Sequence, residues 1–265
     1  MAVQRLSFDR VAECYDATRA LPSAAHEAAI AGIVETLREI AVHPSLLEVG
    51  IGTGRLAVPI AAAGVRVVGV DIATAMLARL RAKQPDLPVT LADAAQLPFA
   101  RPCFDAALFV HILHLLPDAR AALRAASAVV RPGGLLLYGR SDHTDSPRRR
   151  LIARARELAR EIVGVELGAD DWHRAANRAF SDHVRDVCAP VSETTLARWT
   201  EGGTGREFLA AIAGRIFSST WAIPETAMPE LVRQLTPWTE DLLGGLDRPI
   251  ESAASFTLLT AQLPA

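Results

Sequence analysis

The chain has 265 residues, half of them apolar, and a formal net charge of −2 at neutral pH. This length allows one large domain or a core domain with a sizeable insertion, and the near-neutral charge argues against a dedicated nucleic-acid-binding protein. The three widely spaced cysteines do not suggest a disulfide framework, no run of about 20 apolar residues suggests a membrane span, and the first residues lack the apolar run of a signal peptide. We therefore expect a cytoplasmic globular protein that has no nucleic-acid partner; its oligomeric state stays open.

Helical and strand patterns alternate through the first half of the chain. The first 45 residues are expected to be helical, with Ser23 capping a helix whose apolar face is Ile30, Ile33, Val34, Leu37 and Ile40. The expected strands that follow are 46–49, 65–70, 88–91, 104–110 and 134–140. The expected helices between them are 54–63, 74–83 and 118–130. Short strands separated by helices predict a parallel sheet covered on both faces.

The pattern changes after residue 140. Residues 141–192 are rich in Arg, Asp and His and are expected to form two helices, 147–163 and 170–188. The remaining expected elements are a strand at 193–199, a helix at 206–217, a helix at 226–243 broken by Pro237, and a final strand at 255–263. With no repeats and no low-complexity linker, the sequence favours a single domain that contains an insertion.

A glycine-rich turn follows the first expected strand. Residues 46–55 read LLEVGIGTGR, which places Gly50, Gly52 and Gly54 directly after Glu48. Such a turn lets a ligand approach bare backbone, and free N–H groups at the following helix N-terminus would attract an anion. A dinucleotide-binding turn requires G-x-G-x-x-G, and Arg55 stands where its third glycine would be. The pattern here is instead E-x-G-x-G-x-G.

Asp71 stands at the tip of the second expected strand. A carboxylate in this place can accept hydrogen bonds from both hydroxyls of a ribose. Enzymes that use NAD have the same device, so Asp71 indicates a ribosyl ligand without identifying it. A purely structural role for Asp71, as the cap of the following helix, is the alternative.

The turn resembles motif I of the class I S-adenosylmethionine-dependent methyltransferases. The segment LADAAQLPF at 91–99 looks like the methyltransferase segment that binds adenine. Two others, FDAALFVHILHLLPD at 104–118 and RPGG at 131–134, are similar to the small-molecule branch of that family, known as type 11. The N-terminal segment FDRVAECYDATR at 8–19 is similar to the same branch. The resemblance covers roughly residues 8–140 and the final strand. It implies an α/β fold, Rossmann-like and doubly wound, with a mostly parallel seven-stranded sheet, an antiparallel last strand and a helical insertion or cap.

The resemblance also implies a cofactor, S-adenosyl-L-methionine, with S-adenosyl-L-homocysteine as product and a small organic molecule as methyl acceptor. Asp93 would accept a hydrogen bond from the adenine amino group, and the N–H group of Ala94 would donate to a ring nitrogen. Ile72 and Met76 would cover the adenine faces, although a Met at helical spacing is equally well explained as core. The expected cofactor-binding residues are Tyr15, Arg19, Glu48, Gly50, Gly52, Gly54, Asp71, Ile72, Met76, Asp93, Ala94 and Val110.

Tyr15 and Arg19 belong to a segment that, in the resembling branch, closes over the cofactor. They would reach its methionine end, with Arg19 facing the carboxylate. The alternative is a solvated helix face. The chain would accordingly comprise an N-terminal helical lid at 1–45, a cofactor-binding core at 46–140, the helical insertion at 141–192, and C-terminal strands and helices at 193–265.

His111 and His114 are the candidate general bases. They lie at the carboxyl end of a strand, where ligands gather in open α/β sheets, and histidine titrates near neutral pH. A base is needed only if the acceptor loses a proton. The alternatives are that His111 contributes only its backbone and that His114 is packing or surface. No third ligand lies nearby in the sequence, so no metal site is expected.

The insertion is the segment in which we expect the acceptor to be recognised. It contains a group of aromatic and polar residues, Asp170, Asp171, Trp172, His173, Phe180 and His183. An aromatic wall with a few polar groups suits a flat organic acceptor. An ordinary amphipathic helix pair is the plainer interpretation of the same residues.

Two other functions use a similar turn. A dinucleotide-dependent oxidoreductase is disfavoured by Arg55 in place of the third glycine and by the segment at Asp93 and Ala94. A nucleic-acid methyltransferase would carry an Asn/Asp-Pro-Pro-Tyr/Phe sequence after the fourth strand, which residues 109–112 do not match. A regulatory protein that binds the cofactor without turnover remains an alternative, because no indispensable catalytic side chain can be named.

Overall fold

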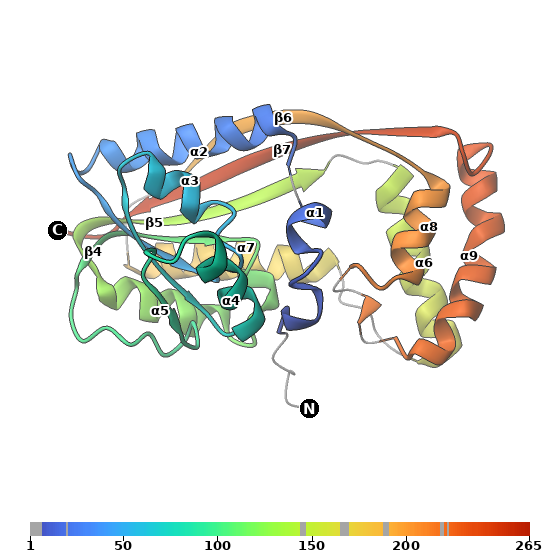
Figure 1. The fold of residues 1–265 in the computed structure, drawn as a ribbon, viewed down its shortest axis with the longest axis horizontal. Coiled ribbons are helices and arrows are strands. Elements are labelled where there is room, and N and C mark those ends of the chain that lie inside the picture. The colour runs from blue at the N-terminus through green and yellow to red at the C-terminus, as the bar shows by residue number, and fades with distance from the viewer. Residues whose placement is uncertain are drawn as a thin grey trace. The chain divides into compact units, whose positions relative to one another are not determined.

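The computed structural model describes residues 7–19, 21–143, 147–164, 170–187, 191–217, 220–221 and 223–265. The chain forms two compact units, each drawn in Figure 1. The first unit comprises Met1–Ser141, Trp172–Ala197 and Phe256–Ala265, and the second comprises Asp142–Asp171 and Arg198–Ser255.

A seven-stranded sheet organises the chain. Its strands are β1 (Ser45–Val49), β2 (Arg66–Asp71), β3 (Val89–Leu91), β4 (Phe104–Val110), β5 (Val130–His143), β6 (Ser192–Thr204) and β7 (Pro249–Gln262). Their order in the sheet is β3-β2-β1-β4-β5-β7-β6. Strand β1 pairs in parallel with β2 on one side and with β4 on the other, β2 pairs in parallel with β3, and β4 with β5.

The last strand runs against its neighbour. The N–H group of Gly133 donates to the carbonyl of Pro264 at 2.9 Å, and that of Leu263 donates to the carbonyl of Gly134 at 2.8 Å. Residue numbers therefore fall along β7 as they rise along β5, which is antiparallel pairing. The predicted doubly wound α/β fold with an antiparallel last strand is confirmed.

The helices and 3₁₀ turns precede β1 or lie between the strands along the chain. They are η1 (Asp9–Val11), α1 (Tyr15–Arg19), α2 (Ser23–Arg38), α3 (Ala57–Ala62), α4 (Thr74–Lys83), η2 (Leu113–Leu115), α5 (Ala119–Val129), α6 (Pro147–Val163), α7 (Asp170–Val187), α8 (Gly205–Ala213), η4 (Glu225–Ala227) and α9 (Met228–Leu243). In the first unit α2 and α3 lie on one face of the sheet and α5 and α7 on the other (Figure 1).

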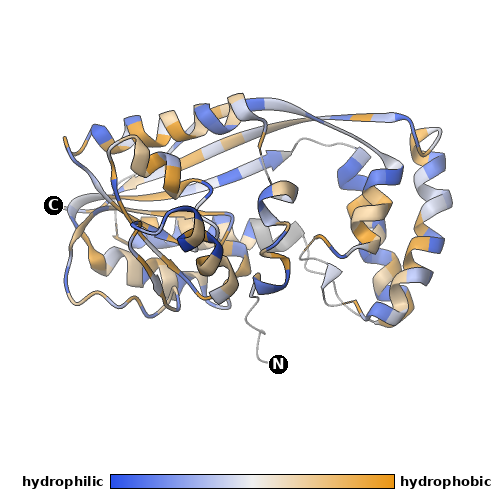
Figure 2. Cartoon of the chain, viewed as in Figure 1, coloured by the Kyte–Doolittle hydropathy of each residue, from blue (hydrophilic) through white to orange (hydrophobic). Residues whose placement is uncertain are grey.

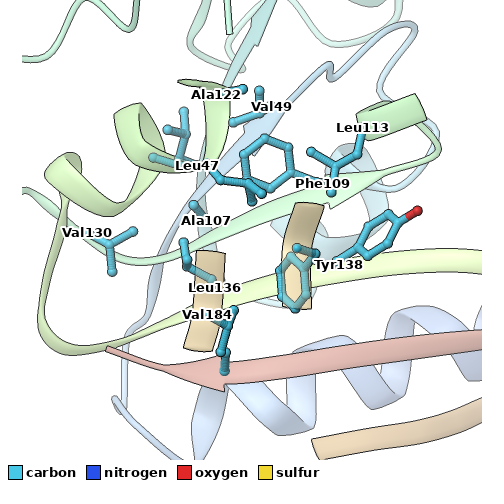
Figure 3. Close-up of a cluster of buried hydrophobic side chains, with 14 of the residues drawn as sticks. Leu47, Val49, Ala107, Phe109, Leu113, Ala122, Val130, Leu136, Tyr138 and Val184 are labelled. Carbon is cyan, nitrogen blue, oxygen red and sulfur yellow. The ribbon is translucent and has the colours of Figure 1, made fainter. Parts of the chain in front are cut away.

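The core of the first unit follows from the pleat of the strands. Side chains of a strand alternate between faces, and Leu47 and Val49 of β1 with Ala107 and Phe109 of β4 join one cluster with β5, α5 and α7. Figure 3 shows this cluster; its members include Leu47, Val49, Ala107, Phe109, Leu113, Ala122, Val130, Leu136, Tyr138 and Val184. The ring centroids of Tyr138 and Phe180 lie 5.5 Å apart in this cluster. Helix α7 is thus part of the sheet's own core.

The second unit has a separate apolar core. Helices α6, α8 and α9 carry both apolar and polar residues (Figure 2). The apolar ones form one buried cluster: Leu151, Ala155, Leu158, Ala159, Phe208, Leu209, Ile212, Ile223, Met228, Leu231, Leu235 and Ile250. A capping box, in which the Thr204 hydroxyl accepts from the Glu207 N–H group and the Glu207 carboxylate accepts from the Thr204 N–H group, starts α8.

Several expected elements differ from those found. Ser23 is the first residue of α2, where its hydroxyl donates to Glu27 and caps no N–H group. Helix α3 begins at Ala57, because the glycine turn continues through residue 54 in a non-helical backbone. Helix α9 continues through Pro237 without a break.

The predicted insertion is divided between the units. Both of its expected helices are present, but α6 packs in the second unit and residues 172–187 of α7 belong to the first. Hydrophobic periodicity predicted that each helix has a buried face. It did not indicate which surface each face would cover.

Replacing Phe180 tests the placement of α7. Phe180 is fully buried in the core of the first unit, so Phe180→Ala should lower the free energy of unfolding by about 3–5 kcal/mol. Chemical denaturation followed by circular dichroism measures this change. The exposed Arg178 of the same helix serves as the control, since Arg178→Ala should shift stability by less than about 0.5 kcal/mol. Equal effects of the two changes would contradict the packing.

Candidate functional site

The sheet order places a crevice at the carboxyl end of β1. From β1 the chain proceeds to β2 and β3 on one side, and β4 and β5 lie on the other. In open α/β sheets ligands bind at such a reversal, outside the carboxyl ends of the strands. The segments that follow β1, β2, β3 and β4 therefore meet at one edge, where the candidate residues lie.

A cavity of about 320 Å³ occupies this crevice. That volume is within the range of about 300–1,000 Å³ found for small-molecule sites. Its walls come from the ends of β1 and β2, from the segment after β3, and from the exit of β4 with the start of α5. They are Val49, Gly50, Val70, Asp71, Ile72, Ala92, Asp93, Ala94, Ala95, Gln96, Ile112, Leu115, Leu116, Pro117, Asp118, Ala121 and Ala122.

The glycine turn between β1 and α3 requires its glycines. Gly50, Gly52 and Gly54 have φ values of 77°, 57° and 75°, which other residues rarely adopt. A Cβ atom on Gly50 would lie 2.2 Å from Ile112 Cδ1, and one on Gly54 would lie 2.3 Å from Leu80 Cδ1. At Gly52 the nearest atom would be Met76 Cε at 3.2 Å. Gly50 and Gly54 are thus fixed by packing and by backbone, and Gly52 mainly by backbone.

Four amides of the glycine turn have acceptors within the protein and are not free to bind an anion. Gly50 and Ile51 donate to the carbonyl of Val70, Gly54 donates to the carbonyl of Ile51, and Gly52 donates to Asp71 Oδ2 at 2.8 Å. Helix α3 also starts three residues after Gly54 and is only six residues long. The protein itself therefore engages these four amides of the turn.

Asp71 holds the turn from the tip of β2. Its carboxylate accepts hydrogen bonds from the N–H groups of Gly52 and Ala73, both at 2.8 Å. Burial raises the pKa of Asp71, and these backbone hydrogen bonds act in the opposite direction. The N-cap of α4 is Ala73, so Asp71 is not the helix cap considered as its alternative role. It lines the cavity beside Ile72.

Glu48 is a buried carboxyl group beneath the turn. It is 4% exposed, and its Oε2 atom has no hydrogen-bond partner among the described residues. Burial raises its pKa to about 8; Arg55 opposes this effect and Asp71 adds to it. Glu48 therefore carries a proton at neutral pH in this state and would ionise if a cation approached.

Only some of the residues predicted to contact adenine lie in the cavity wall. Asp93, Ala94 and Ile72 line the cavity, and Ile72 is 38% exposed. Met76 is buried against Ala12 and Ala73, which favours the core role considered for it. Val110 ends β4 opposite Gly139 of β5 and does not line the cavity.

Tyr15 packs against the buried cluster that contains Met76 and does not lie on a solvated face. Its ring meets that of Phe8 edge to face, with centroids 5.9 Å apart, and both pack against the cluster of Met76. Arg19 ends α1, and its side chain lies outside the described residues.

His111 and His114 lie at the exit of β4. His111 adopts a φ of 54°, its N–H group donates to the carbonyl of Gly139, and its Nε2 atom lies 3.3 Å from the Ser141 hydroxyl. His114 belongs to the turn η2, three residues on. Neither side chain lines the cavity. Among the described residues, no group of three or more His, Cys, Asp or Glu could hold a metal ion.

Among the residues expected to recognise the acceptor, two pack in the core, and the side chains of the others are outside the part of the chain that the structure describes. The side chains of Asp170, Asp171, Trp172 and His173 lie outside the described residues. Phe180 packs on Tyr138, and His183 Nε2 lies 2.8 Å from the Ser127 hydroxyl. These two side chains are core, as the plainer interpretation had it.

Sequence reasoning missed one wall of the cavity. Leu115, Leu116 and Pro117 lie between β4 and α5, and Ala121 lies in the first turn of α5. The available signal was Asp118, whose carboxylate caps α5 by accepting from the N–H group of Ala121 at 2.8 Å. A helix start directly after β4, in a fold that binds ligands at strand ends, indicates a wall there.

Comparisons with known proteins agree with this arrangement. Residues 47–138 match the family model described as a methyltransferase domain. The chain is 33% identical over 140 residues to a demethylmenaquinone methyltransferase of Paenarthrobacter aurescens, covering 53% of this chain and 55% of the relative. It is 30% identical over 165 residues to a 27-O-demethylrifamycin SV methyltransferase of Amycolatopsis mediterranei, covering 59% and 60%. The chain thus spans little more than half the length of these relatives.

Solved structures share the fold at low sequence identity. The YcgJ protein from Bacillus subtilis superimposes with a TM-score of 0.55 at 17% identity, over 91% of this chain and 99% of that one. The phosphoethanolamine N-methyltransferase 2 of Haemonchus contortus gives a TM-score of 0.52 at 18% identity, over 97% of this chain and 58% of that one. No helix among the described residues is long and apolar enough to cross a membrane.

Two glycines at positive φ, one inside the glycine turn and one outside it, separate an effect on the turn from backbone strain alone. Gly52→Ala and Gly64→Ala each place a side chain at positive φ, and no atom lies within 4 Å of the Cβ position at Gly64. Each change should lower the free energy of unfolding by roughly 1–2 kcal/mol. Only Gly52→Ala should also weaken binding of S-adenosylhomocysteine, as measured by calorimetry. Equal affinity in the two variants would contradict the placement of the site.

Proposed function

We propose that this chain transfers a methyl group from S-adenosyl-L-methionine to a small organic acceptor, on the premise that residues 47–138 match the family model of a methyltransferase domain. One observation carries the proposal. A single cavity brings together Gly50 after β1, Asp71 after β2, and Asp93 with Ala94 after β3. These are the residues that the resemblance assigns to the turn, the ribose and the adenine.

The residues of the site fit an adenosyl ligand. The Asp71 carboxylate can accept about four hydrogen bonds, and the N–H groups of Gly52 and Ala73 use two of them. It therefore has capacity for a ribose hydroxyl. Asp93 uses Oδ1 to accept from the N–H group of Ala95 at 2.9 Å, which fixes its side chain at the cavity wall. Ile72, Leu115 and Leu116 supply apolar wall suited to a flat base.

Glu48 fits the cationic part of the same ligand. A buried carboxyl group with one unpartnered oxygen is costly to ionise unless a positive charge arrives. The cofactor carries positive charge at its sulfonium and ammonium groups. We assign Glu48 to that end of the ligand from its place two residues before Gly50 at the carboxyl end of β1, although its buried side chain does not itself line the cavity.

Bound cofactor supplies an electrophilic methyl group whose transfer releases a neutral thioether. The protein's contribution is to hold the acceptor in line and to exclude water, and such positioning can lower a barrier by about 7–11 kcal/mol. The apolar exit of β4 and the buried turn serve this exclusion.

We propose His111 over His114 as the base for an acceptor that must lose a proton. The ring of His111 is oriented by Ser141 on the neighbouring strand β5 and meets the edge of Phe256, with centroids 6.2 Å apart. Its backbone is held at positive φ, where histidine is one of the better tolerated residues. The acceptor itself is a small molecule, as the relatives named for demethylmenaquinone and demethylrifamycin SV suggest.

Ligand binding followed by methyl transfer tests the function. Calorimetry of the whole chain should give binding of S-adenosylhomocysteine and none of NADH. Incubation with methyl-labelled S-adenosylmethionine and fractionated small metabolites should move the label to one fraction. Binding without transfer to any fraction would favour the regulatory alternative. Binding of NADH alone would contradict the proposal.

Glu48→Gln should raise the stability of the protein and at the same time weaken ligand binding. The folded pKa of about 8 lies above the ordinary value of 4.5, so the wild-type protein loses stability as pH rises from 4.5 to 8, where only the unfolded chain is ionised. Glutamine does not titrate, so the variant should gain on the order of 2–4 kcal/mol relative to wild type across that interval. It should at the same time bind S-adenosylhomocysteine more weakly. Denaturation at pH 5 and pH 8 with parallel calorimetry measures both, and a stability difference independent of pH would contradict the buried carboxyl.

A further inference from the structure

The N-terminal segment, residues 8–16, is fastened to both ends of helix α4. Asp9 Oδ1 accepts from the N–H group of Ala75 at 2.7 Å, in the first turn of α4. Asp16 Oδ2 forms an ion pair with Lys83, the last residue of α4. Between these ends Phe8, Ala12 and Tyr15 pack against Ala73 and Met76. A carboxylate thus meets the positive end of the helix dipole and another meets a lysine at its negative end.

Asp16 also contacts the glycine turn. The Thr53 hydroxyl donates to Asp16 Oδ1 at 2.5 Å, and Lys83 Nζ lies 3.4 Å from the Thr53 carbonyl. Thr53 stands between Gly52 and Gly54 and is 1% exposed. One carboxylate therefore joins the N-terminal segment, the end of α4 and the centre of the turn.

The two partners of Asp16, the Lys83 ammonium group and the Thr53 hydroxyl, differ in their exposure to solvent. The ion pair is half-exposed, with side-chain exposures of 42% for Lys83 and 43% for Asp16, and such pairs contribute little by themselves. The Thr53 hydroxyl is buried, so loss of its acceptor leaves a polar group unsatisfied. Partial burial acts to raise the pKa of Asp16, but the hydrogen bonds from Lys83 and Thr53 outweigh it and lower that pKa below its ordinary value. The carboxylate stays charged at neutral pH.

We propose that Asp16 is a positioning residue for the cofactor site, which holds Thr53 and so keeps the glycine turn in its binding conformation. Asp16 touches the turn and not the cavity walls, so it acts through Thr53. It follows that release of the N-terminal segment and release of the ligand are coupled, because both require the Asp16 contacts to break. This inference rests on the proposed function for the identity of the ligand.

Hydrogen exchange of the ligand-free protein gives the first test. The N–H groups of residues 50–52 and 54 are hydrogen bonded within the turn and to its supports, so their exchange rates report its order. Asp16→Ala should accelerate their exchange. Glu13→Ala, which removes a charge from the same segment at an exposed side chain, should not. Unchanged exchange in Asp16→Ala would overturn the proposal.

Ligand dissociation gives the second test. With the whole chain captured by an affinity tag, Asp16→Ala and Lys83→Gln should each release S-adenosylhomocysteine about fivefold faster than wild type. Lys83→Arg keeps the charge and should retain most of the slow release, and Glu13→Ala should match wild type. Lys83→Gln keeps the test decisive if Asp16→Ala fails to fold. Wild-type dissociation rates in both variants would overturn the proposal for Asp16. If the wild-type protein binds no S-adenosylhomocysteine, the proposed function is refuted, and the hydrogen-exchange test alone decides the role of Asp16.

Discussion

The parallel pairing of β1 with both β2 and β4 is the constraint on which the site depends. It brings the ends of three strands to one edge of the sheet, and it forces the chain to reverse direction immediately after Val49. A reversal in so little space requires left-handed backbone, which explains the three glycines at positive φ. Asp71, from the neighbouring strand, then fixes the turn through the Gly52 N–H group. The strand pairing, the glycine turn and Asp71 at the strand tip therefore depend on one another.

The parts that could be predicted from sequence are those written in local patterns. Apolar runs and helical spacing predicted β1 to β4 and helices α4 and α5 to within a few residues, and the glycine spacing with Asp71 and Asp93 located the cavity. The seven strands and the antiparallel last strand followed from the resemblance and not from any local pattern. The start of α3 was misjudged, because the spacing of its apolar residues is helical while the preceding glycines hold the backbone in another conformation.

What sequence could not supply is contact between distant segments. Nothing in the sequence around Phe180 indicates that α7 joins the core of the sheet while α6 joins another cluster, because both helices have similar apolar faces. No local pattern around Asp9, Asp16 and Lys83 indicates their partners, which lie 37 to 67 residues away. Glu48 was recognised by its place in a motif, but its raised pKa follows from complete burial, which no spacing reveals.

The engaged amides of the glycine turn have a consequence for selectivity. Nucleotide-binding proteins hold pyrophosphate with open backbone N–H groups, and here Gly50, Ile51, Gly52 and Gly54 already donate to protein acceptors. A competing nucleotide would have to break those bonds and bring its negative charge close to Asp71. These four amides therefore offer no free donors to a phosphate group, and the Asp71 carboxylate beside them would repel one.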